Sequence, residues 1–359
     1  MAKVVVAMSG GVDSSVAAAL LKENGYDVIG ATMKTWGGKT LLVEDVRPTC
    51  YGPGEEQDIE DARKVAQVLG ISHYIFDLKE EYKARVLDYF CQEYLSGRTP
   101  NPCIQCNQMV KFDALVKKIL DSGINFDYFA TGHYARVEYN KSKCRYLLKK
   151  GKDLTKDQSY FLFNLSQEQL GHTLFPLGNY TKGEVRTIAQ ALGLGVSNKP
   201  ESQNFIAGGY LQLVEAEAKP GPILDEQGNV LGQHQGIPFY TIGQRRGLGV
   251  SVGERLYVVA IEQERNAIVV GTKKEVYEDE LIASDLNWIA VERLWQPEEV
   301  KAKIRYLHKE AEAEITPLDG GKVRLKFKEP QMAIAPGQAV VFYDRDVVMG
   351  GGKIERAGR

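Results

Sequence analysis

The chain has 359 residues, of which 43% are hydrophobic and 26% charged, with a formal net charge of -2. This composition is typical of globular proteins, and the length allows more than one hydrophobic core. The apolar run VVVAM at residues 4–8 is short and is followed by glycines, so it predicts neither a signal peptide nor a membrane span. We therefore expect a cytoplasmic protein with no membrane partner.

The first half of the chain alternates short β-branched runs with helical patterns. Strands are predicted at 4–8, 27–33, 73–78 and 127–135, and helices at 14–25, 58–70, 80–97 and 112–123. This alternation indicates βαβ units, and so an α/β fold with a doubly wound parallel sheet.

The pattern changes after about residue 204. Short strands broken by Gly, Pro and Asn follow, and beyond residue 281 several runs alternate apolar and polar residues with a period of two. We predict three domains: an α/β domain at 1–204, a small mixed central domain at 205–281, and a C-terminal β-barrel domain at 282–359.

The stretch AMSGGVDSS, residues 7–15, lies where the first strand turns into the first helix. Its small residues allow close approach of the backbone to a phosphate chain, its serines add donors, and the helix start adds a positive dipole end. No Lys follows the glycines, so it is not a Walker loop, and the spacing is not that of a dinucleotide fingerprint. A capped tight turn is the structural alternative.

A basic run extends from Lys141 to Lys156, with seven Lys or Arg residues and one acid. A solvated hairpin and a contact with nucleic-acid phosphates are both compatible with this charge pattern.

The glycine loop resembles that of the ATP pyrophosphatases, which adenylate a substrate oxygen and release pyrophosphate. The resemblance implies ATP and Mg²⁺ as cofactors, with Asp13 organising the metal. It implies that the nucleotide is held by Ala7, Met8, Ser9, Gly10, Gly11, Val12, Asp13 and Ser14.

Later motifs make nearly the whole chain similar to the tRNA-specific 2-thiouridylase family. They are ATMKTW (31–36), NPCIQCNQMVKF (101–112), ATGHYAR (130–136), KDQSYFL (156–162), GQHQGIPFYTIGQRRGLG (232–249), IRYLH (304–308) and APGQAVVFYD (335–344). The resemblance implies ATP-dependent adenylation of the carbon-2 oxygen of the wobble uridine, followed by displacement of AMP by sulfur. Met33 and Gly132 would line the adenosine pocket.

The same resemblance implies contacts with the anticodon arm of tRNA. The residues concerned are Asn101, Pro102, Cys103, Lys156, Asp157, Gln158, Arg305 and Tyr306. We expect Arg305 and Tyr306 on a barrel strand, one facing outward and the other inward. Arg245 and Arg246 fit a surface turn or a second anion contact equally well, and His133 is interpreted as structural rather than as a proton carrier.

Typical members of the family use two cysteines, a nucleophile and a persulfide carrier. Cys106 matches the first, but KPESQNFIAGGY at 199–210 contains no cysteine, and Asn204 stands near the expected position of the second. The two-thiol mechanism therefore cannot operate in that form.

Three other thiols offer a substitute. Cys103 and Cys106 form a C-x-x-C pair, and Cys50 follows the second strand, so all three can converge at the carboxyl edge of the sheet. We interpret them as ligands of a 4Fe-4S cluster whose open iron would bind hydrosulfide, with Cys103, Cys106 and Asp13 as the catalytic residues. The alternatives are a redox pair, or Cys106 as a lone nucleophile supplied by an external donor.

The sulfur donor would be a cysteine desulfurase relay or free sulfide. Cys91 is interpreted as a packed thiol and Cys144 as inert. An amidating ATP pyrophosphatase and a non-catalytic tRNA-binding protein remain as rival functions.

Overall fold

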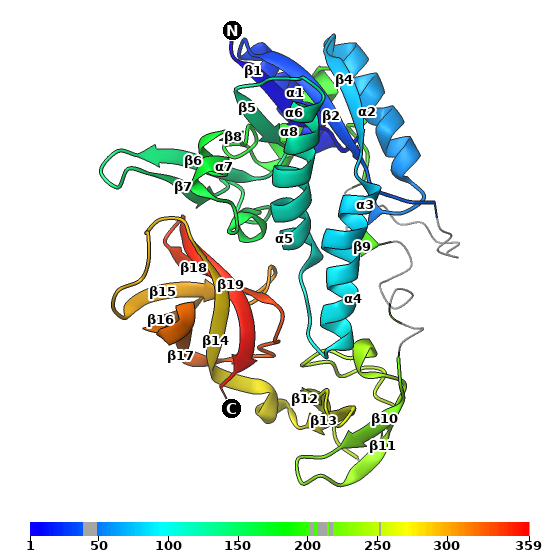
Figure 1. Ribbon diagram of the computed structural model, residues 1–359, viewed down its shortest axis with the longest axis vertical. Helices are drawn as coiled ribbons and strands as arrows, with labels where there is room; N and C mark the ends of the chain where they lie inside the picture. Colours follow the sequence, from blue (N-terminus) through cyan, green and yellow to red (C-terminus); the bar gives the residue numbers. More distant parts are fainter. Residues whose placement is uncertain (39–48, 201–203, 207–213, 215–217, 251–252, 359) are drawn as a thin grey trace. The chain divides into compact units, whose positions relative to one another are not determined.

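The computed structural model describes residues 1–38, 49–200, 204–206, 214, 218–250 and 253–358 (Figure 1). The chain forms two compact units. The first consists of Met1–Val86, Pro102–Gly209 and Asp346–Val348, and the second of Leu87–Asn101, Tyr210–Arg345 and Met349–Arg359. The domain boundaries predicted at 204 and 281 stay predictions.

The first unit is built on a parallel sheet of five strands in the order β4-β2-β1-β5-β8. These strands are β1 (Lys3–Ala7), β2 (Asp27–Lys34), β4 (Ser72–Asp77), β5 (Tyr128–Thr131) and β8 (Thr173–Leu174). Val4, Val5 and Val6 of β1 have no exposed surface, because a central parallel strand is covered on both faces. The predicted parallel α/β fold is confirmed.

Helices α1 (Val12–Glu23), α2 (Glu55–Leu69) and α8 (Lys182–Ala191) belong to this unit. Helix α1 packs against α8 and carries an almost continuously buried face of small residues, so it lies close to the sheet. Both helices contribute to one apolar core together with β1.

A continuous helical segment carries the C-x-x-C pair. Helix α5 (Pro102–Cys106) continues into a π-helical segment, Asn107–Ala114, and then into α6 (Leu115–Asp121). Proline suits the first position of a helix because its missing N–H has no partner there. The helix predicted from residue 112 therefore begins ten residues earlier, at Pro102.

Smaller elements complete the first unit. They are β3 (Thr49–Tyr51) paired in parallel with β9 (Asn204–Ile206), the hairpin β6 (Ala135–Asn140) and β7 (Arg145–Lys150), α7 (Gln167–Gly171) and the single turn α3 (Lys79–Tyr82), which leads into a π-helical turn at Lys83–Leu87. The strand predicted at 127–135 is thus two strands, β5 and the start of β6.

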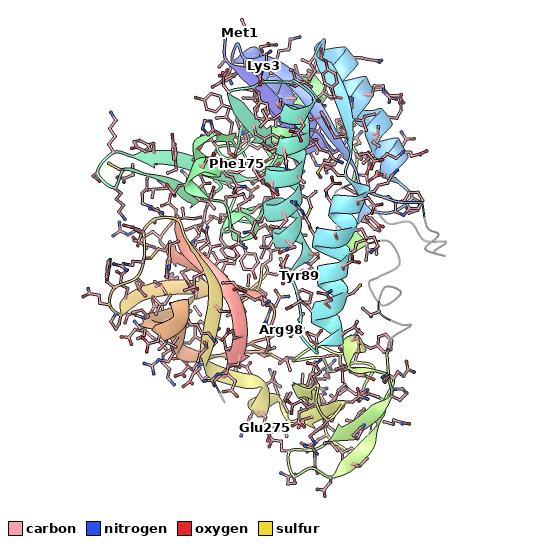
Figure 2. All side chains as sticks on the ribbon, viewed as in Figure 1. Met1, Lys3, Tyr89, Arg98, Phe175 and Glu275 are labelled. Atoms are coloured by element: carbon pink, nitrogen blue, oxygen red, sulfur yellow. The ribbon has the colours of Figure 1, made fainter. Side chains whose placement is uncertain are left out.

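The second unit begins with α4 (Asp88–Leu95), so the helical run predicted at 80–97 is shared between the two units. Glu93 of α4 accepts hydrogen bonds from Arg98 at 3.0 Å and from Lys353 of the last strand at 3.2 Å. The ammonium of Lys353 also lies 5.7 Å from the ring centroid of Tyr89. Figure 2 labels Tyr89 and Arg98. These contacts join α4 to the end of the chain.

Two β-structures form the rest of the second unit. A four-stranded sheet is ordered β11-β10-β13-β12, with β10 (Gly221–Leu224), β11 (Val230–His234), β12 (Tyr257–Glu262) and β13 (Ala267–Gly271). The C-terminal strands β14 (Tyr277–Trp288), β17 (Lys322–Met332), β16 (Ala311–Leu318), β15 (Glu298–Lys303), β18 (Ala339–Asp344) and β19 (Val347–Ala357) follow in that order, and β14 pairs with β19. This pairing closes the predicted barrel around its own apolar core.

Within the described residues, no helix combines the length and the apolar character that crossing a membrane requires.

Candidate functional site

The loop between β1 and α1 has the compact backbone that phosphate binding requires. Gly10 has φ of +71°, and a β-carbon there would lie 2.0 Å from the carbonyl oxygen of Asp58. Gly132 is also restricted, because its β-carbon would lie 2.7 Å from the Ser14 nitrogen. Only glycine fits either position, so backbone segments from two strands and a helix meet around the start of α1.

Serine side chains hold the loop together from within. The hydroxyl of Ser14 accepts from the backbone N–H of Ser9 at 3.2 Å and donates to the carbonyl of Gly11 at 3.2 Å. Ser15 donates to the same carbonyl at 2.8 Å. The predicted phosphate loop is therefore already ordered by its own hydrogen bonds, which reduces the entropy cost of binding an anion.

Asp13, in the first turn of α1, is engaged by two groups that the sequence motifs did not single out. Lys182, the first residue of α8, donates to both carboxylate oxygens at 2.7 and 2.8 Å. The hydroxyl of Tyr134 donates to one of them at 2.8 Å. Helix packing between α1 and α8 produces this pair across 169 residues of sequence, so no local pattern could predict it.

Lys199 supports the opposite side of the loop. Its ammonium donates to the carbonyl of Gly10 at 3.1 Å, to Asp58 at 2.7 Å, and to Asp61. Burial is the largest single influence on Asp61 and opposes its charged form. The hydrogen bonds from Lys199 and Gln57, together with nearby lysine charges, outweigh burial and lower the pKa of this carboxyl. Lys199, the first residue of the KPESQ motif, is thereby tied to the phosphate loop.

Met33 and Gly132, the predicted adenosine residues, lie at the carboxyl ends of β2 and β5. Both strands neighbour β1 in the sheet, so both positions flank the phosphate loop, as ligand sites in open parallel sheets do. Their contact with adenosine stays a prediction.

Cys50, Cys103 and Cys106 form what we term the thiol site. Burial raises the pKa of Cys103 to about 12, and the charges of Cys50 and Cys106 contribute. Burial also raises the pKa of Cys106, while the charge of Lys111 opposes the rise. The three predicted thiols therefore lie within electrostatic range of one another, although Cys50 is exposed at the surface of its strand.

Two tyrosines accompany the thiol site. Burial raises the pKa of Tyr82 well above its usual value of 10.0, and all three thiols add to the rise. The ring of Tyr51 stacks on that of Tyr82, with centroids 5.3 Å apart and planes 7° from parallel. No sequence motif singles out either tyrosine, because an aromatic residue in a short strand or helix usually serves packing.

The thiol site matches a metal-sulfur cluster in the kind of donor it offers. However, among the described residues no group of three or more His, Cys, Asp or Glu side chains is arranged to hold a metal ion. None of the five cysteines, all within the described ranges, is disulfide-bonded. The three thiols thus influence one another electrostatically, but their side chains are not arranged as ligands of a metal ion.

The strand of Cys50 lies beside the segment that lacks the expected second cysteine. Strand β3 pairs in parallel with β9, with Thr49 opposite Asn204 and Tyr51 opposite Ile206. The backbone therefore places Cys50 beside Asn204–Ile206, near which the family resemblance predicts a second thiol.

His133 is held as a neutral imidazole. Its Nδ1 lies 2.7 Å from the hydroxyl of Thr131, and its ring packs against Phe112 and Phe175 (Figure 2 labels Phe175). Burial lowers its pKa well below 6.5, and the charge of Lys111 lowers it further. This environment agrees with the structural interpretation of His133.

Of the predicted tRNA residues, Asp157 and Gln158 form hydrogen bonds within the first unit. Buried Asp157 accepts from the backbone N–H groups of Gly151 and Ser159, each at 3.1 Å, and Gln158 accepts from that of Tyr134 at 3.0 Å. These bonds shape the turn that presents half-exposed Lys156. Asn101 and Pro102 lie immediately before and at the start of α5.

The prediction that Arg305 and Tyr306 lie on a barrel strand is wrong. Strand β15 ends at Lys303, and both residues lie in the turn that follows. Arg305 donates to the carbonyls of Met332 and Ala333 at 3.0 and 3.4 Å, so it braces the turn against the end of β17. The alternating pattern of β15 therefore does not continue as a strand through Arg305, whose side chain donates to backbone carbonyls instead.

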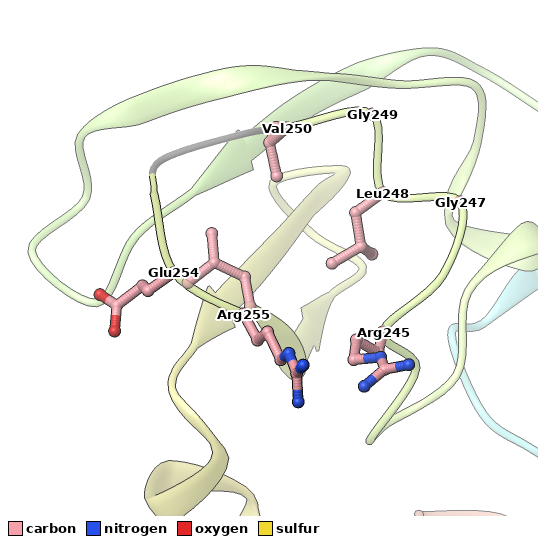
Figure 3. A pocket seen from close by; sticks show the side chains of 8 residues that line it. Arg245, Gly247, Leu248, Gly249, Val250, Glu254 and Arg255 are labelled. Atoms are coloured by element: carbon pink, nitrogen blue, oxygen red, sulfur yellow. The ribbon is translucent and has the colours of Figure 1, made fainter.

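Arg245 lines a hollow of about 320 Å³ together with residues 247–250 and 254–256, which precede β12. The guanidinium groups of Arg245 and Arg255 point toward the same side of this hollow (Figure 3). Both side chains are exposed, as a surface turn and an anion contact would each require.

The parallel sheet and its glycine–serine loop define an α/β protein of the nucleotide-binding class. Three family models cover the chain: the tRNA methyl transferase HUP domain at residues 2–207, the tRNA methyl transferase PRC-barrel domain at 210–272, and the aminomethyltransferase beta-barrel domain at 278–354.

Full-length relatives are more specific. The tRNA-specific 2-thiouridylase MnmA of Acetivibrio thermocellus is 52% identical over 363 residues, covering 98% of this chain and 99% of that protein. The enzymes of the same name from Caldicellulosiruptor saccharolyticus and Moorella thermoacetica are 50% and 52% identical, covering 99% and 98% of this chain and 99% of each relative. The chain belongs to the tRNA-specific 2-thiouridylase family.

A solved 4-thiouridine synthetase–RNA complex with bound ATP aligns at a TM-score of 0.34 and 19% identity, over 60% of this chain and 49% of that one. This likeness is too weak to add to the assignment.

Proposed function

We propose that this protein is a tRNA-uridine 2-sulfurtransferase that acts on the wobble uridine in the anticodon arm. The observation that carries the proposal is sequence identity of 50–52%, over nearly the full length, to enzymes named tRNA-specific 2-thiouridylase. It also favours thiolation over the two rival functions, amidation and non-catalytic tRNA binding. The cytoplasm, where tRNA is found, is the proposed location.

The first step is adenylation of the substrate. The carbon-2 oxygen of uridine attacks the α-phosphorus of ATP, a new P–O bond forms, and pyrophosphate leaves. The loop from Ala7 to Ser14 would hold the phosphates, and Asp13 would help to hold Mg²⁺, which screens the phosphate charge during in-line attack. The product carries AMP on carbon 2, a far better leaving group than the original oxygen.

The second step replaces that oxygen by sulfur. A sulfur nucleophile at the oxidation level of sulfide attacks carbon 2, a C–S bond forms, the C–O bond breaks, and AMP leaves with both electrons. No net oxidation is needed if the donor is hydrosulfide. The thiol site belongs to the same compact unit as the phosphate loop, and Cys50 lies just before α2, whose Asp58 contacts Gly10.

We propose that Cys50, Cys103 and Cys106 hold a 4Fe-4S cluster. Such a cluster with three protein ligands would supply an open iron that binds hydrosulfide. The proposal is supported by three thiols within electrostatic range of one another and by the absence of a cysteine from KPESQNFI. Among the described residues no three such side chains are arranged to hold a metal ion, so cluster binding would require the thiol side chains to rearrange.

The alternative is that Cys106 acts as a lone nucleophile supplied by a desulfurase relay. The two routes differ in their need for iron. Protein purified without oxygen should be brown and contain about four irons if the cluster is present. Colourless protein that thiolates tRNA fully would favour Cys106 alone.

A further inference from the structure

The carboxylate of Asp13 already has partners from its own chain at every oxygen. One oxygen accepts from the ammonium of Lys182 at 2.7 Å and from the hydroxyl of Tyr134 at 2.8 Å, and the other accepts from Lys182 at 2.8 Å. The side chains of Lys182 and Asp13 are only 12% and 31% exposed. The ammonium is thus largely buried, whereas the carboxylate at the proposed nucleotide site is partly exposed.

Contacts at the start of α8 fix the backbone position of Lys182 beside the phosphate loop. Thr181 and Glu184 form a reciprocal capping box at the start of α8, and the backbone N–H of Lys182 donates to Asp153 at 3.1 Å. The ring of Tyr134 lies 5.9 Å from the ammonium. Because α8 packs against α1, the backbone of Lys182 is already close to Asp13, which lowers the entropy cost of forming the ion pair.

This arrangement conflicts with simple binding of a metal at Asp13. An ammonium that donates to both oxygens occupies the positions that a divalent cation would use, and two cations at one carboxylate repel each other. Asp13 can therefore accept Mg²⁺ only if Lys182 moves away. A nearby phosphate chain offers the displaced ammonium an alternative negative partner.

We propose that Lys182 exchanges partners when the nucleotide binds. Without nucleotide, Lys182 neutralises Asp13 and keeps divalent metal away from it. When Mg-ATP enters, Lys182 releases Asp13 to the metal and donates to a phosphoryl oxygen of the triphosphate. Metal binding thereby becomes dependent on nucleotide binding. The inference depends on the proposed function only for ATP as the ligand, since neither tRNA nor sulfur takes part.

The test compares wild type with Lys182→Met, using two probes that should respond in opposite directions. Mn²⁺ alone, measured by electron paramagnetic resonance, should bind more tightly to the variant, because Asp13 has lost its competing cation. The Mg²⁺ complex of α,β-methylene-ATP, measured by calorimetry, should bind roughly ten- to a hundredfold more weakly, because a charged hydrogen bond to phosphate is lost. Adenosine, which has no phosphate, should bind equally to both.

Matched variants separate exchange from a structural role. Lys152→Met removes an exposed ammonium that pairs with Glu184 of the same helix, and it should leave all three affinities unchanged. Adding Asp13→Asn to Lys182→Met should abolish the gain in Mn²⁺ affinity. Lys182→Gln keeps a donor without the charge, so it should show the same opposite pair of effects if the Met variant is unstable.

Mn²⁺ affinity that stays the same or falls in these variants would overturn the exchange, as would unchanged affinity for the nucleotide analogue. Failure of the proposed function would look different, since tRNA thiolation would be absent while both probes still behaved as expected.

Discussion

The carbonyl oxygen of Asp58 stands 2.0 Å from the point where a β-carbon on Gly10 would lie, so α2 closes tightly over the phosphate loop. Lys199 holds the same two residues from the side, at 3.1 Å from the Gly10 carbonyl and 2.7 Å from the Asp58 carboxylate. The loop is thus fixed by contacts from two distant segments as well as by its own sequence.

Gly10→Ala should therefore displace α2 and weaken both folding and nucleotide binding. The left-handed backbone alone costs about 1–2 kcal/mol for Ala, and the contact with Asp58 adds to this. Gly25→Ala is a matched control, because Gly25 has φ of +83° but nothing lies near its β-carbon. Denaturant unfolding should show a larger loss for Gly10→Ala, and equal losses would mean that α2 yields easily.

Asp13→Ala should abolish tRNA-dependent release of pyrophosphate, because the carboxylate that would hold the metal is removed. Circular dichroism should show a folded protein, since Asp13 is partly exposed. Asp27→Ala, an exposed carboxylate at the start of β2, serves as the control with normal release. A folded Asp13 variant that releases pyrophosphate at a near-normal rate would remove this residue from the mechanism.

Lys199→Met should lower the free energy of unfolding at neutral pH by about 1–3 kcal/mol, because Asp58 and Asp61 lose a charged hydrogen-bond donor. Asp61 has a lowered pKa in the folded protein, so its share is present above its ordinary value of 3.8 and is lost as pH falls through the lowered value. Chemical denaturation at several pH values should show the two proteins converging in acid. A difference that persists after Asp61 is protonated would assign the effect to packing.

The basic hairpin should bind tRNA phosphates through its tip. Lys141 and Lys143 are exposed there, whereas Lys150 is buried and Lys149 pairs with Glu138 at 3.1 Å. Reversing both tip lysines to Glu should weaken tRNA binding and reduce its salt slope by about one for each phosphate that a lysine no longer neutralises. Binding titrations at several salt concentrations measure this slope.

Affinity for ATP should be unchanged in the tip variant. Lys117→Glu, an exposed charge reversal on α6, is the matched control. An unchanged salt slope in the tip variant would return the hairpin to a solvated surface feature.

Replacing Cys50, Cys103 or Cys106 singly by Ala should abolish thiolation if they hold a cluster, whereas Cys91→Ala and Cys144→Ala should not. Pyrophosphate release should survive all five changes, because adenylation needs only the loop and the metal. The measurements are 2-thiouridine content by mass spectrometry and iron content after anaerobic reconstitution. Activity with free sulfide should require iron-loaded protein, and full activity of iron-free protein with only Cys106 indispensable would contradict the cluster.

The sequence by itself determined the class of the fold and the family. Hydrophobic periodicity identifies the parallel sheet and the barrel, because the burial of each strand depends on its own residues. The motif AMSGGVDSS locates the loop, because a tight turn needs small residues in succession. The turn at Arg305 escaped this reasoning, since its backbone acceptors come from a strand that lies 27 residues later.

Only the tertiary structure decided which distant side chains meet. Three contacts each join segments more than 140 residues apart: Lys182 with Asp13, Lys199 with Gly10, and the Cys50 strand with Asn204–Ile206. A lysine at a helix start or a cysteine in a three-residue strand carries no local sign of its partner. Long-range packing selects these contacts because ion pairs and strand pairings depend on the three-dimensional distance between groups, which spacing along the chain does not specify.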